Sequence, residues 1–371
     1  MRTSSFTRPW SGAWQTALLA LLMASGAAQA APRYRVLDLG LLEFHSTSNA
    51  LDINNRGEIV GWSLDGVPDG DRIGFLWRNG VMQAIKSPDY RSSSAEGINE
   101  HGQIALTGFE GDGLFPPSAY VYDSGSGRLQ RIPTPSGFGT AVAINNAGHV
   151  IGIGNVNGPA EHYLYDGTAS SRLPENLAFA FDINDADAIA GYRNDGRPAI
   201  YQDGTVTALS SQRGQAEALN NRGQVVGQLE PTDTEPGGLF LYSDGRLQLL
   251  DTGGRGGFAT DINEHGSVVG TLEDNTDGVT TRLPFVYRNG TLQDLNTLLT
   301  PEADAAWTLI EANAINDRGW IVGMGELVGG ADNNAFVAIP VPEPGAWALM
   351  LVGAGVIGAV ACRRAVRHTL P

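Results

Sequence analysis

The stretch ALDINNRGEIVG, residues 50–61, decides the fold because variants of it recur through the chain. Each copy has an asparagine at its fifth position and an alanine four positions before it. The asparagines are Asn54, Asn99, Asn145, Asn184, Asn220, Asn263 and Asn316. Successive copies lie 36 to 53 residues apart. A period in this range indicates a repeat architecture.

Each repeat predicts four short antiparallel strands. In the first repeat they are Ala50–Ile53, Glu58–Gly61, Gly74–Trp77 and Val81–Ile85. Asn54 and Gly57 form a tight turn, with the asparagine side chain as its cap and the glycine at positive φ. Asn79-Gly80 is typical of a type I′ hairpin. Four strands per repeat is the pattern of a β-propeller blade.

The two ends of the repeat region complement each other. The last repeat stops after Ala335–Ala338 and lacks its fourth strand, whereas Val36–Leu39 precedes the first repeat as an orphan strand. The orphan resembles the fourth strand of an earlier repeat, Leu292–Leu295. We therefore expect an all-β, seven-bladed propeller of four-stranded blades over residues 31–340, with the N-terminal strand closing the last blade.

The C-terminal segment, residues 341–371, contains three elements in order. Pro342-Glu343-Pro344 precedes an uncharged run over residues 346–362, and a basic tail follows with Arg363, Arg364 and Arg367. The run is long enough for a transmembrane helix, and the arginines favour a cytoplasmic end. This layout resembles the PEP-CTERM sorting signal of Gram-negative, exopolysaccharide-producing bacteria. That resemblance implies processing by an exosortase and only transient contact with the membrane. An ordinary C-terminal anchor is the alternative.

The N-terminal segment, residues 1–30, has the layout of a signal peptide. Arg2 and Arg8 precede an apolar core at residues 17–24, and Ala28-Gln29-Ala30 is a small-x-small cleavage motif. We expect the mature chain to begin at Ala31. Both ends therefore predict export across the inner membrane, to the extracellular space or the cell surface.

The repeat also resembles the HAF extracellular repeat of secreted bacterial proteins. The matching residues are the Ile-Asn-x-x-Gly-x-Val-Val-Gly core and the Phe-x-Tyr/Trp strand, over most of residues 34–340. The His-Ala-Phe triplet is missing. Two repeats depart from the pattern, at Leu106 and Asp187, where glycines are expected. The resemblance implies location and fold and no particular activity.

The net charge of the chain limits the kinds of partner that it can bind. The chain has 24 Lys+Arg and 40 Asp+Glu residues. Five of the arginines and no acidic residue lie in residues 1–30 and 344–371, so residues 31–343 carry a net charge of −21. Such a surface repels nucleic acid and anionic lipid. The single cysteine, Cys362, lies in the sorting segment, which excludes a disulfide or thiol chemistry from the mature protein.

Candidate ligand positions fall on the connections between the second and third strands and between blades, which share one face and vary in length. Aromatic candidates are Tyr90, Phe138, Phe258 and Trp307. Acidic candidates for calcium are Asp65, Asp69, Asp71, Asp274 and Asp277. Calcium prefers six to eight oxygen ligands, but these loops lack EF-hand spacing. Alternatively, the acids fill solvated turns, and no cofactor is required.

Three aspartates occupy one repeat position, two residues before the asparagine: Asp52, Asp182 and Asp261. Either they ring the axis and attract a cation, or each caps its neighbouring turn. His-x-x-x-His, Gly-x-Ser-x-Gly and phosphate-loop motifs are missing from the sequence. We therefore expect a non-enzymatic, monomeric propeller that binds or scaffolds extracellular polysaccharide in the biofilm matrix. The alternative is a polysaccharide-degrading enzyme, a glycosidase or a lyase, on the same scaffold.

Overall fold

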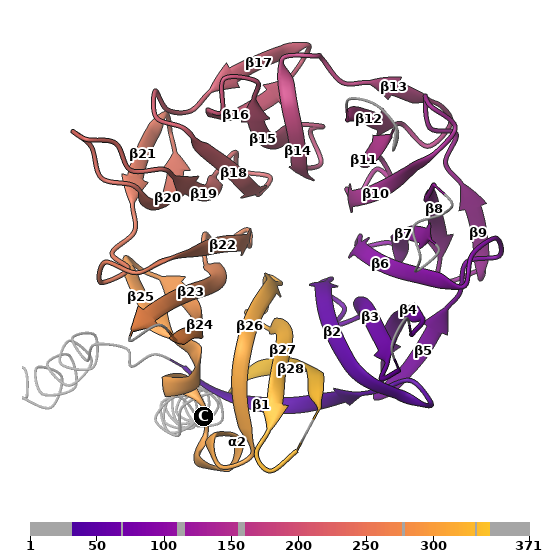
Figure 1. Cartoon of the computed structure of the whole chain (residues 1–371), viewed down its shortest axis with the longest axis vertical. Helices are drawn as coiled ribbons and strands as arrows, with labels where there is room; N and C mark the ends of the chain where they lie inside the picture. Colours follow the sequence, from indigo (N-terminus) through magenta and orange to yellow (C-terminus); the bar gives the residue numbers. More distant parts are fainter. Residues whose placement is uncertain are drawn as a thin grey trace, which may run out of the picture. The chain divides into compact units, whose positions relative to one another are not determined.

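The computed structural model describes residues 32–67, 70–109, 116–154, 160–276, 279–330 and 332–341. These residues form seven four-stranded antiparallel sheets. The sheets stand radially around a central axis, as Figure 1 shows. The predicted seven-bladed propeller is therefore confirmed.

Each blade runs outward from the axis in chain order. The innermost strands are β2 (His45–Ile53), β6 (Ser92–Ile98), β10 (Gly139–Ile144), β14 (Leu177–Ile183), β18 (Gly214–Leu219), β22 (Gly256–Ile262) and β26 (Trp307–Ile315). The second strands are β3 (Ile59–Asp65), β7 (Gln103–Phe109), β11 (Val150–Gly154), β15 (Ile189–Arg193), β19 (Val225–Leu229), β23 (Val268–Thr276) and β27 (Ile321–Leu327). The third strands are β4 (Arg72–Arg78), β8 (Ser118–Asp123), β12 (Glu161–Tyr165), β16 (Pro198–Gln202), β20 (Gly238–Ser243), β24 (Val279–Arg288) and β28 (Asn333–Val341). The outer strands are β5 (Val81–Ile85), β9 (Arg128–Arg131), β13 (Ser170–Arg172), β17 (Thr205–Ala208), β21 (Arg246–Leu249), β25 (Thr291–Asp294) and, in the last blade, β1 (Arg33–Gly40).

Strand β1 closes the ring. It pairs antiparallel with β28 from Arg33↔Val341 to Gly40↔Ala335, so the first strand of the chain completes the seventh blade. The pairing is longer than the predicted four-residue strand. Both carboxylate oxygens of Asp38 also accept from Asn334 Nδ2, at 3.1 Å each.

A second element covers the outer edge of β1. The connection between blades 6 and 7 forms a 3₁₀ helix, η1 (Leu295–Leu298), and a short helix, α2 (Pro301–Asp304). Tyr34 forms a parallel bridge with Leu299, and its carbonyl accepts from Thr300 N at 2.8 Å. The edge at the start of β1 is therefore paired on both sides, which removes a site for edge-to-edge association.

The core lies between neighbouring blades. Six of the seven third strands place an aromatic ring there: Phe75, Tyr120, Tyr163, Phe240, Phe285 and Phe336, none more than 2% exposed. Six of the seven repeat alanines face second-strand glycines, as in Ala50↔Gly61, whereas Ala95 of blade 2 faces Leu106. A Cβ on Gly61 would lie 2.0 Å from the Asn49 carbonyl oxygen, so this glycine is required by close backbone approach.

Every innermost strand carries a β-bulge at the same place, just after its repeat alanine. The register shifts there in all seven blades, for example between Ala50 and Asp52. A bulge re-aims the side chains that follow it. In this molecule the residues that follow are the three aspartates and the asparagine.

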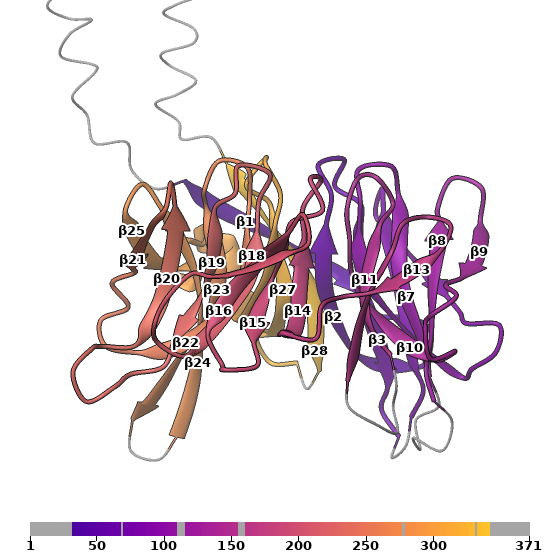
Figure 2. The same ribbon diagram turned by 90° about the horizontal axis from the view of Figure 1, so that it is seen from above.

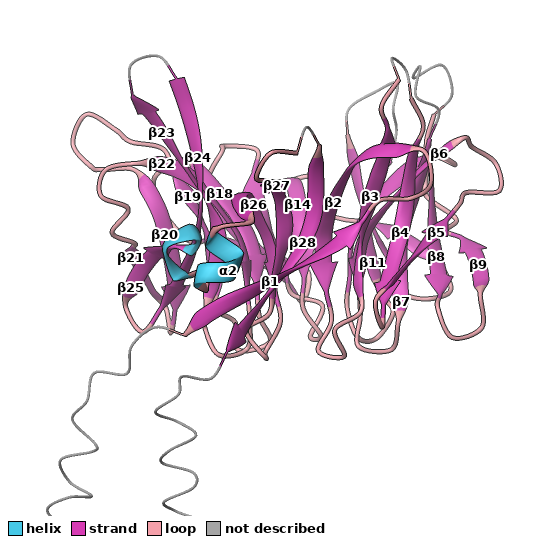
Figure 3. Cartoon of the chain, turned by 90° about the horizontal axis from the view of Figure 1, so that it is seen from below, coloured by secondary structure: helices cyan, strands magenta, loops and turns pink. Residues whose placement is uncertain are grey.

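The propeller has two distinct faces. The turn face carries the Asn-x-x-Gly turns between first and second strands and the hairpins between third and outer strands. The loop face carries the connections from second to third strands and from one blade to the next. Figures 2 and 3 show that the long hairpin of β23 and β24 projects from the loop face. Arg33 begins β1 and Val341 ends β28 as register partners at the turn face.

Candidate functional site

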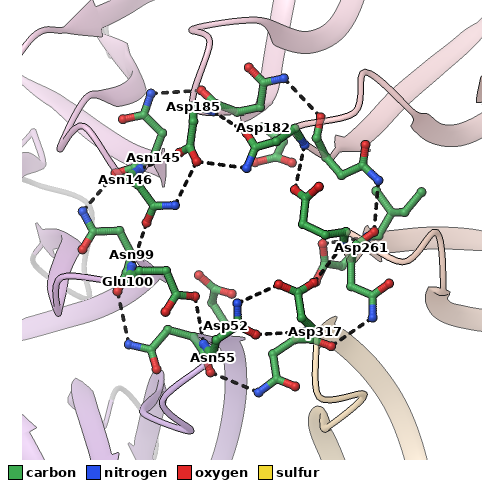
Figure 4. Close-up of a pocket in the computed structure, with 18 of the residues that line it drawn as sticks. Asp52, Asn55, Asn99, Glu100, Asn145, Asn146, Asp182, Asp185, Asp261 and Asp317 are labelled. Atoms are coloured by element: carbon green, nitrogen blue, oxygen red, sulfur yellow. Dashed lines mark hydrogen bonds between the residues drawn. The ribbon is translucent and has the colours of Figure 1, made fainter.

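A cavity of about 240 Å³ lies on the axis at the turn face. The same repeat positions line it in every blade: the asparagine, the apolar residue before it and the polar residue after it. Asp52, Asp182 and Asp261 add three carboxyl groups (Figure 4). Arginine, lysine and histidine are missing from its described lining.

The repeat asparagines form a closed ring of hydrogen bonds. Each Nδ2 donates to the main-chain carbonyl of the corresponding asparagine in the next blade, at 2.9–3.1 Å, and Asn316 returns to Asn54. Each Oδ1 accepts from two backbone N–H groups of its own turn, as Asn54 does from Arg56 and Glu58. The predicted turn cap is confirmed. The donation between blades is a second role that the repeat spacing did not indicate.

A second ring surrounds the mouth of the cavity. Its members follow the asparagines directly: Asn55, Glu100, Asn146, Asp185, Asn221, Glu264 and Asp317. The backbone N–H of each donates to the side chain of the next blade's member, at 2.8–2.9 Å. Four members are carboxylates, so the rim is acidic. The two rings tie every blade to its neighbour through side chains.

The blade 4 turn keeps this geometry without its glycine. Asp187 occupies the glycine position with φ +57° and donates its N–H to the Asn184 carbonyl at 3.1 Å. Asp is among the few residues that tolerate this conformation. Its carboxylate also contacts Asn145 Nδ2 and His149 Nδ1, at 2.8 Å each. The departure from the repeat therefore adds a contact between blades rather than loosening the turn.

The three aspartates both reach the axis and bond locally. Each accepts from the next residue in its own blade and from the equivalent N–H in the following blade, as Asp182 does from Ile183 and Leu219 at 2.8 and 2.9 Å. Asp52 and Asp261 accept from the equivalent N–H groups of their own and the following blade, at 2.7 Å each. Within the described ranges, no three His, Cys, Asp or Glu side chains are grouped so as to hold a metal ion.

Burial changes the protonation of these carboxyl groups. Desolvation raises the pKa of Asp52 to about 6 and of Asp182 to about 7, although the two backbone N–H donors act in the opposite direction. Desolvation also raises the pKa of Asp261 well above its usual value, and repulsion from Asp52 and Asp182 adds to the effect. Near neutral pH the axis therefore carries fewer charges than its three carboxyl groups suggest.

This predicts a pH-dependent stability that one substitution removes. Folded Asp182 keeps a proton from about pH 4 to 7, whereas the unfolded group releases it near 3.8. The stabilisation is complete below the unfolded pKa and is lost as pH rises through the folded pKa. Between pH 5 and 8 we expect the free energy of unfolding of the parent to fall by about 2 kcal/mol relative to that of Asp182→Ala. This value is smaller than the full pKa shift implies, because water in the cavity screens the carboxylate.

Urea unfolding of both proteins at pH 5, 6, 7 and 8 measures that difference. Alanine fits the position because Ala143, Ala218 and Ala314 occupy it in other blades. Asp233→Ala, at an exposed loop position, is the matched control and should follow the parent at every pH. A parent-minus-variant difference that does not change with pH would contradict the proposed protonation.

The four predicted ligand aromatics do not gather at one site. Trp307 is buried and packs its ring edge-on against Phe336 at 6.3 Å. Tyr90 donates its hydroxyl to the Pro116 carbonyl at 2.7 Å, which makes it part of the scaffold. Only Phe138 and Phe258 are exposed, at 42% and 45%, on blades 3 and 6.

A groove on the loop face borders the sheet face from which Phe258 projects. This groove, of about 540 Å³, is lined by Glu273 and residues 280–282 of the β23–β24 hairpin and by residues 308–310 of β26. Phe258 pairs with Thr271, and Glu273 lies two residues further along β23, so both side chains project from the same sheet face. We call this cavity the blade 6–7 groove.

One basic side chain in the lining of the blade 6–7 groove is held in place by its neighbours. Arg282 forms an ion pair with Glu311, whose other oxygen accepts from Asn49 Nδ2 at 3.4 Å. Asn49 in turn accepts from Asn313 Nδ2 at 2.8 Å. The network spans blades 6, 7 and 1, so it holds the guanidinium in place. Arg282 carries no signal in the repeat pattern, because its partner Glu311 lies in a different repeat.

The predicted calcium positions are only partly described. Asp65 ends β3 and Asp71 precedes β4, and Asp71 pairs with Arg91 at 3.1 Å. Asp274 accepts from Arg255 Nε at 3.0 Å. Asp69 and Asp277 lie outside the described residues. Calcium binding stays a prediction.

Both terminal predictions also lie outside the described residues. They comprise the cleavage positions Ala28, Ala30 and Ala31 and the sorting positions Pro342, Glu343, Pro344, Arg363, Arg364 and Arg367. In the part of the chain that the structure describes, no helix is both long and apolar enough to span a bilayer.

A match to a sequence family lies at the end of the chain. Residues 340–365 match the PEP-CTERM protein-sorting motif. No curated protein matches the chain in sequence. The resemblance to HAF repeats stays a prediction.

Solved structures share the propeller fold at low sequence identity. The β-propeller domain of the Trilobed protease from Pyrococcus furiosus, described as having an open velcro topology, aligns at TM-score 0.58 and 12% identity, over 80% of this chain and 94% of that domain. The acylaminoacyl peptidase of Pyrococcus horikoshii aligns at 0.55 and 11% identity, over 83% of this chain but 54% of that one. U3-55K aligns at 0.51 and 12% identity, over 84% and 100%. These similarities concern the fold alone.

Proposed function

We propose that this protein is an exported, non-enzymatic propeller that presents its loop face to extracellular polysaccharide. One observation carries the proposal: the propeller begins and ends at the same place. Arg33 and Val341 are register partners at the turn face, and the sorting motif follows directly. The chain therefore attaches to its sorting segment through the turn face.

The attachment is short. Only Pro342, Glu343, Pro344 and Gly345 separate Val341 from the uncharged run that begins at Ala346. Four residues span at most about 14 Å. While that run is in the inner membrane, the turn face is held towards the bilayer and the loop face away from it.

The acidic rim favours separation from the membrane. Glu100, Asp185, Glu264 and Asp317 surround the axial mouth on the turn face. Carboxylates repel anionic headgroups, so once an exosortase removes the segment, electrostatics favour release. The processing protease would be the protein's partner at the membrane of a Gram-negative cell.

The loop face has the properties of a binding surface. Five of the six large apolar side chains that are exposed in the described residues lie there: Phe44, Val67, Phe138, Phe258 and Val328. They come from connections or strand ends on a rigid scaffold, where binding residues are commonly found. The net charge of −21 over residues 31–343 disfavours polyanions and favours neutral polysaccharide.

Binding and hydrolysis are separated by one comparison on the secreted protein. A glycan array reports retention, and a reducing-end assay on the same glycans reports cleavage. We expect reversible retention without new reducing ends. New reducing ends without unsaturation would favour the glycosidase alternative, and new reducing ends together with unsaturated sugars would favour a lyase. No retention of any glycan would overturn the binding proposal.

Processing makes a separate prediction about mass. Because the sorting motif begins where the last strand ends, we expect the secreted chain to start at Ala31 and to lack Trp347–Val360. Intact-mass spectrometry of secreted material measures both ends. Glu343→Ala should retain the segment and keep the protein in the membrane fraction, whereas Glu326→Ala on β27 should not. A secreted parent that keeps residues 347–360 would sink the sorting account in favour of a permanent anchor.

A further inference from the structure

We infer that the blade 6–7 groove is a binding subsite for a neutral oligosaccharide segment. The inference rests on the proposed function and assigns its ligand to one place on the loop face. At about 540 Å³, the groove is within the range of roughly 300–1,000 Å³ that small-molecule sites occupy. It lies between the projecting hairpin and the innermost strand of blade 7.

The lining combines hydroxyl, charged and apolar groups. Thr280 is exposed and lies two residues before Arg282 on β24, so both side chains project from the sheet face that lines the groove. Its hydroxyl both donates and accepts hydrogen bonds. Ile310, which is half-buried, contributes apolar surface. This mixture matches a sugar, whose ring carries hydroxyl groups at its edges and C–H groups on its faces.

Charge selects a neutral sugar over an acidic one. Arg282 is neutralised by Glu311, and Glu273 leaves the groove with a negative balance. A carboxylate or sulfate on the sugar would be repelled by this net negative charge and by the acidic surface around the groove. The planar guanidinium still has N–H groups that point away from Glu311, and these suit two neighbouring hydroxyls.

The polar groups are held before a ligand arrives. Glu311 is fixed by Asn49, and Asn49 by Asn313, so the Arg282 side chain is positioned by three blades. Preorganisation lowers the entropy cost of binding. Phe258, 45% exposed, projects from the same sheet face as Glu273 and offers an aromatic surface next to the residues that line the groove.

The test measures binding of neutral oligosaccharides to the secreted protein by calorimetry. The probes are cello-, laminari-, xylo- and manno-oligosaccharides, with oligogalacturonate and an extended neutral peptide for comparison. Thr280→Val removes a hydroxyl from the groove side of the sheet at nearly constant shape. We expect a roughly fivefold increase in Kd, from one lost hydrogen bond. Thr281→Val is the matched control and should leave Kd unchanged, because this adjacent exposed threonine projects from the opposite face of the same sheet.

A second measurement does not depend on folded variants. A bound oligosaccharide should slow phenylglyoxal labelling of Arg282 in the parent and leave that of Arg222, on the turn face, unchanged. Parent-like Kd in Thr280→Val, or undiminished labelling of Arg282, would overturn the groove assignment while the proposed function stands. Tighter binding of oligogalacturonate or of the peptide would also overturn it. If the parent binds none of the sugars, the proposed function itself fails.

Discussion

Deletion of residues 33–40 is expected to abolish the cooperative melting of the native ring and to leave a protein that associates through its open edge. The deletion removes the whole of β1 and bares β28 from Ala335 to Val341. Tyr34 and Leu39, at 0% and 4% exposure, each contribute roughly 2–3 kcal/mol by burial. With the ladder hydrogen bonds, the loss exceeds about 5 kcal/mol, against a typical total of about 5–15 kcal/mol.

Circular dichroism melting and light scattering measure the two effects. Arg33→Ala, which loses only a hydrogen bond to the Leu299 carbonyl, is the control and should cost about 1 kcal/mol or less. A synthetic peptide of residues 33–41 should restore the transition by refilling the edge. A deletion variant that melts as the parent does and stays monomeric would show that the clasp does not stabilise the ring.

The Asn220→Ala substitution is expected to cost about 3–5 kcal/mol. The side chain is 4% exposed and makes four hydrogen bonds, to Arg222 N, Gln224 N, Gln224 Oε1 and the Asn263 carbonyl. Alanine leaves buried backbone groups without partners, at about 1–3 kcal/mol each. Asn220→Asp should also destabilise, because it turns a carboxylate oxygen towards the Asn263 carbonyl.

Chemical denaturation gives these free energies directly. The control is Asn221→Ala, the adjacent member of the rim, whose exposed side chain exchanges its bonds to Asp185 for water. Its cost should be about 1 kcal/mol or less. Similar losses for the two substitutions would show that the asparagine ring is no more important than the rim.

The repeats predicted the fold because both of its determinants are local. Asn54 and Gly57 specify a turn within four residues, and Ala50 marks where the second strand comes close. Closure by Val36–Leu39 could also be predicted, since the last repeat lacks a strand and an extra strand precedes the first repeat. The covering of β1 by η1 and α2 could not be predicted, because Tyr34 and Leu299 lie far apart in the chain and carry no repeat signal.

The candidate site was less predictable for the same reason. The bulge after each alanine is a backbone feature, so the sequence did not indicate that Asp182 would accept from two blades at once. Trp307 was predicted as a ligand residue, but its ring packs against Phe336 from another strand. Arg282 and Glu311 meet across a blade boundary. Sites between repeats depend on spatial neighbours, and a single sequence does not contain them.

Hydrogen–deuterium exchange tests the central claim that ligands bind at the loop face. The secreted protein is compared with and without a saturating neutral oligosaccharide selected by the glycan array. We predict slower exchange in the β23–β24 hairpin and at the start of β26, with the Asn-x-x-Gly turns unchanged. Protection confined to those turns, around the axial cavity, would contradict the account.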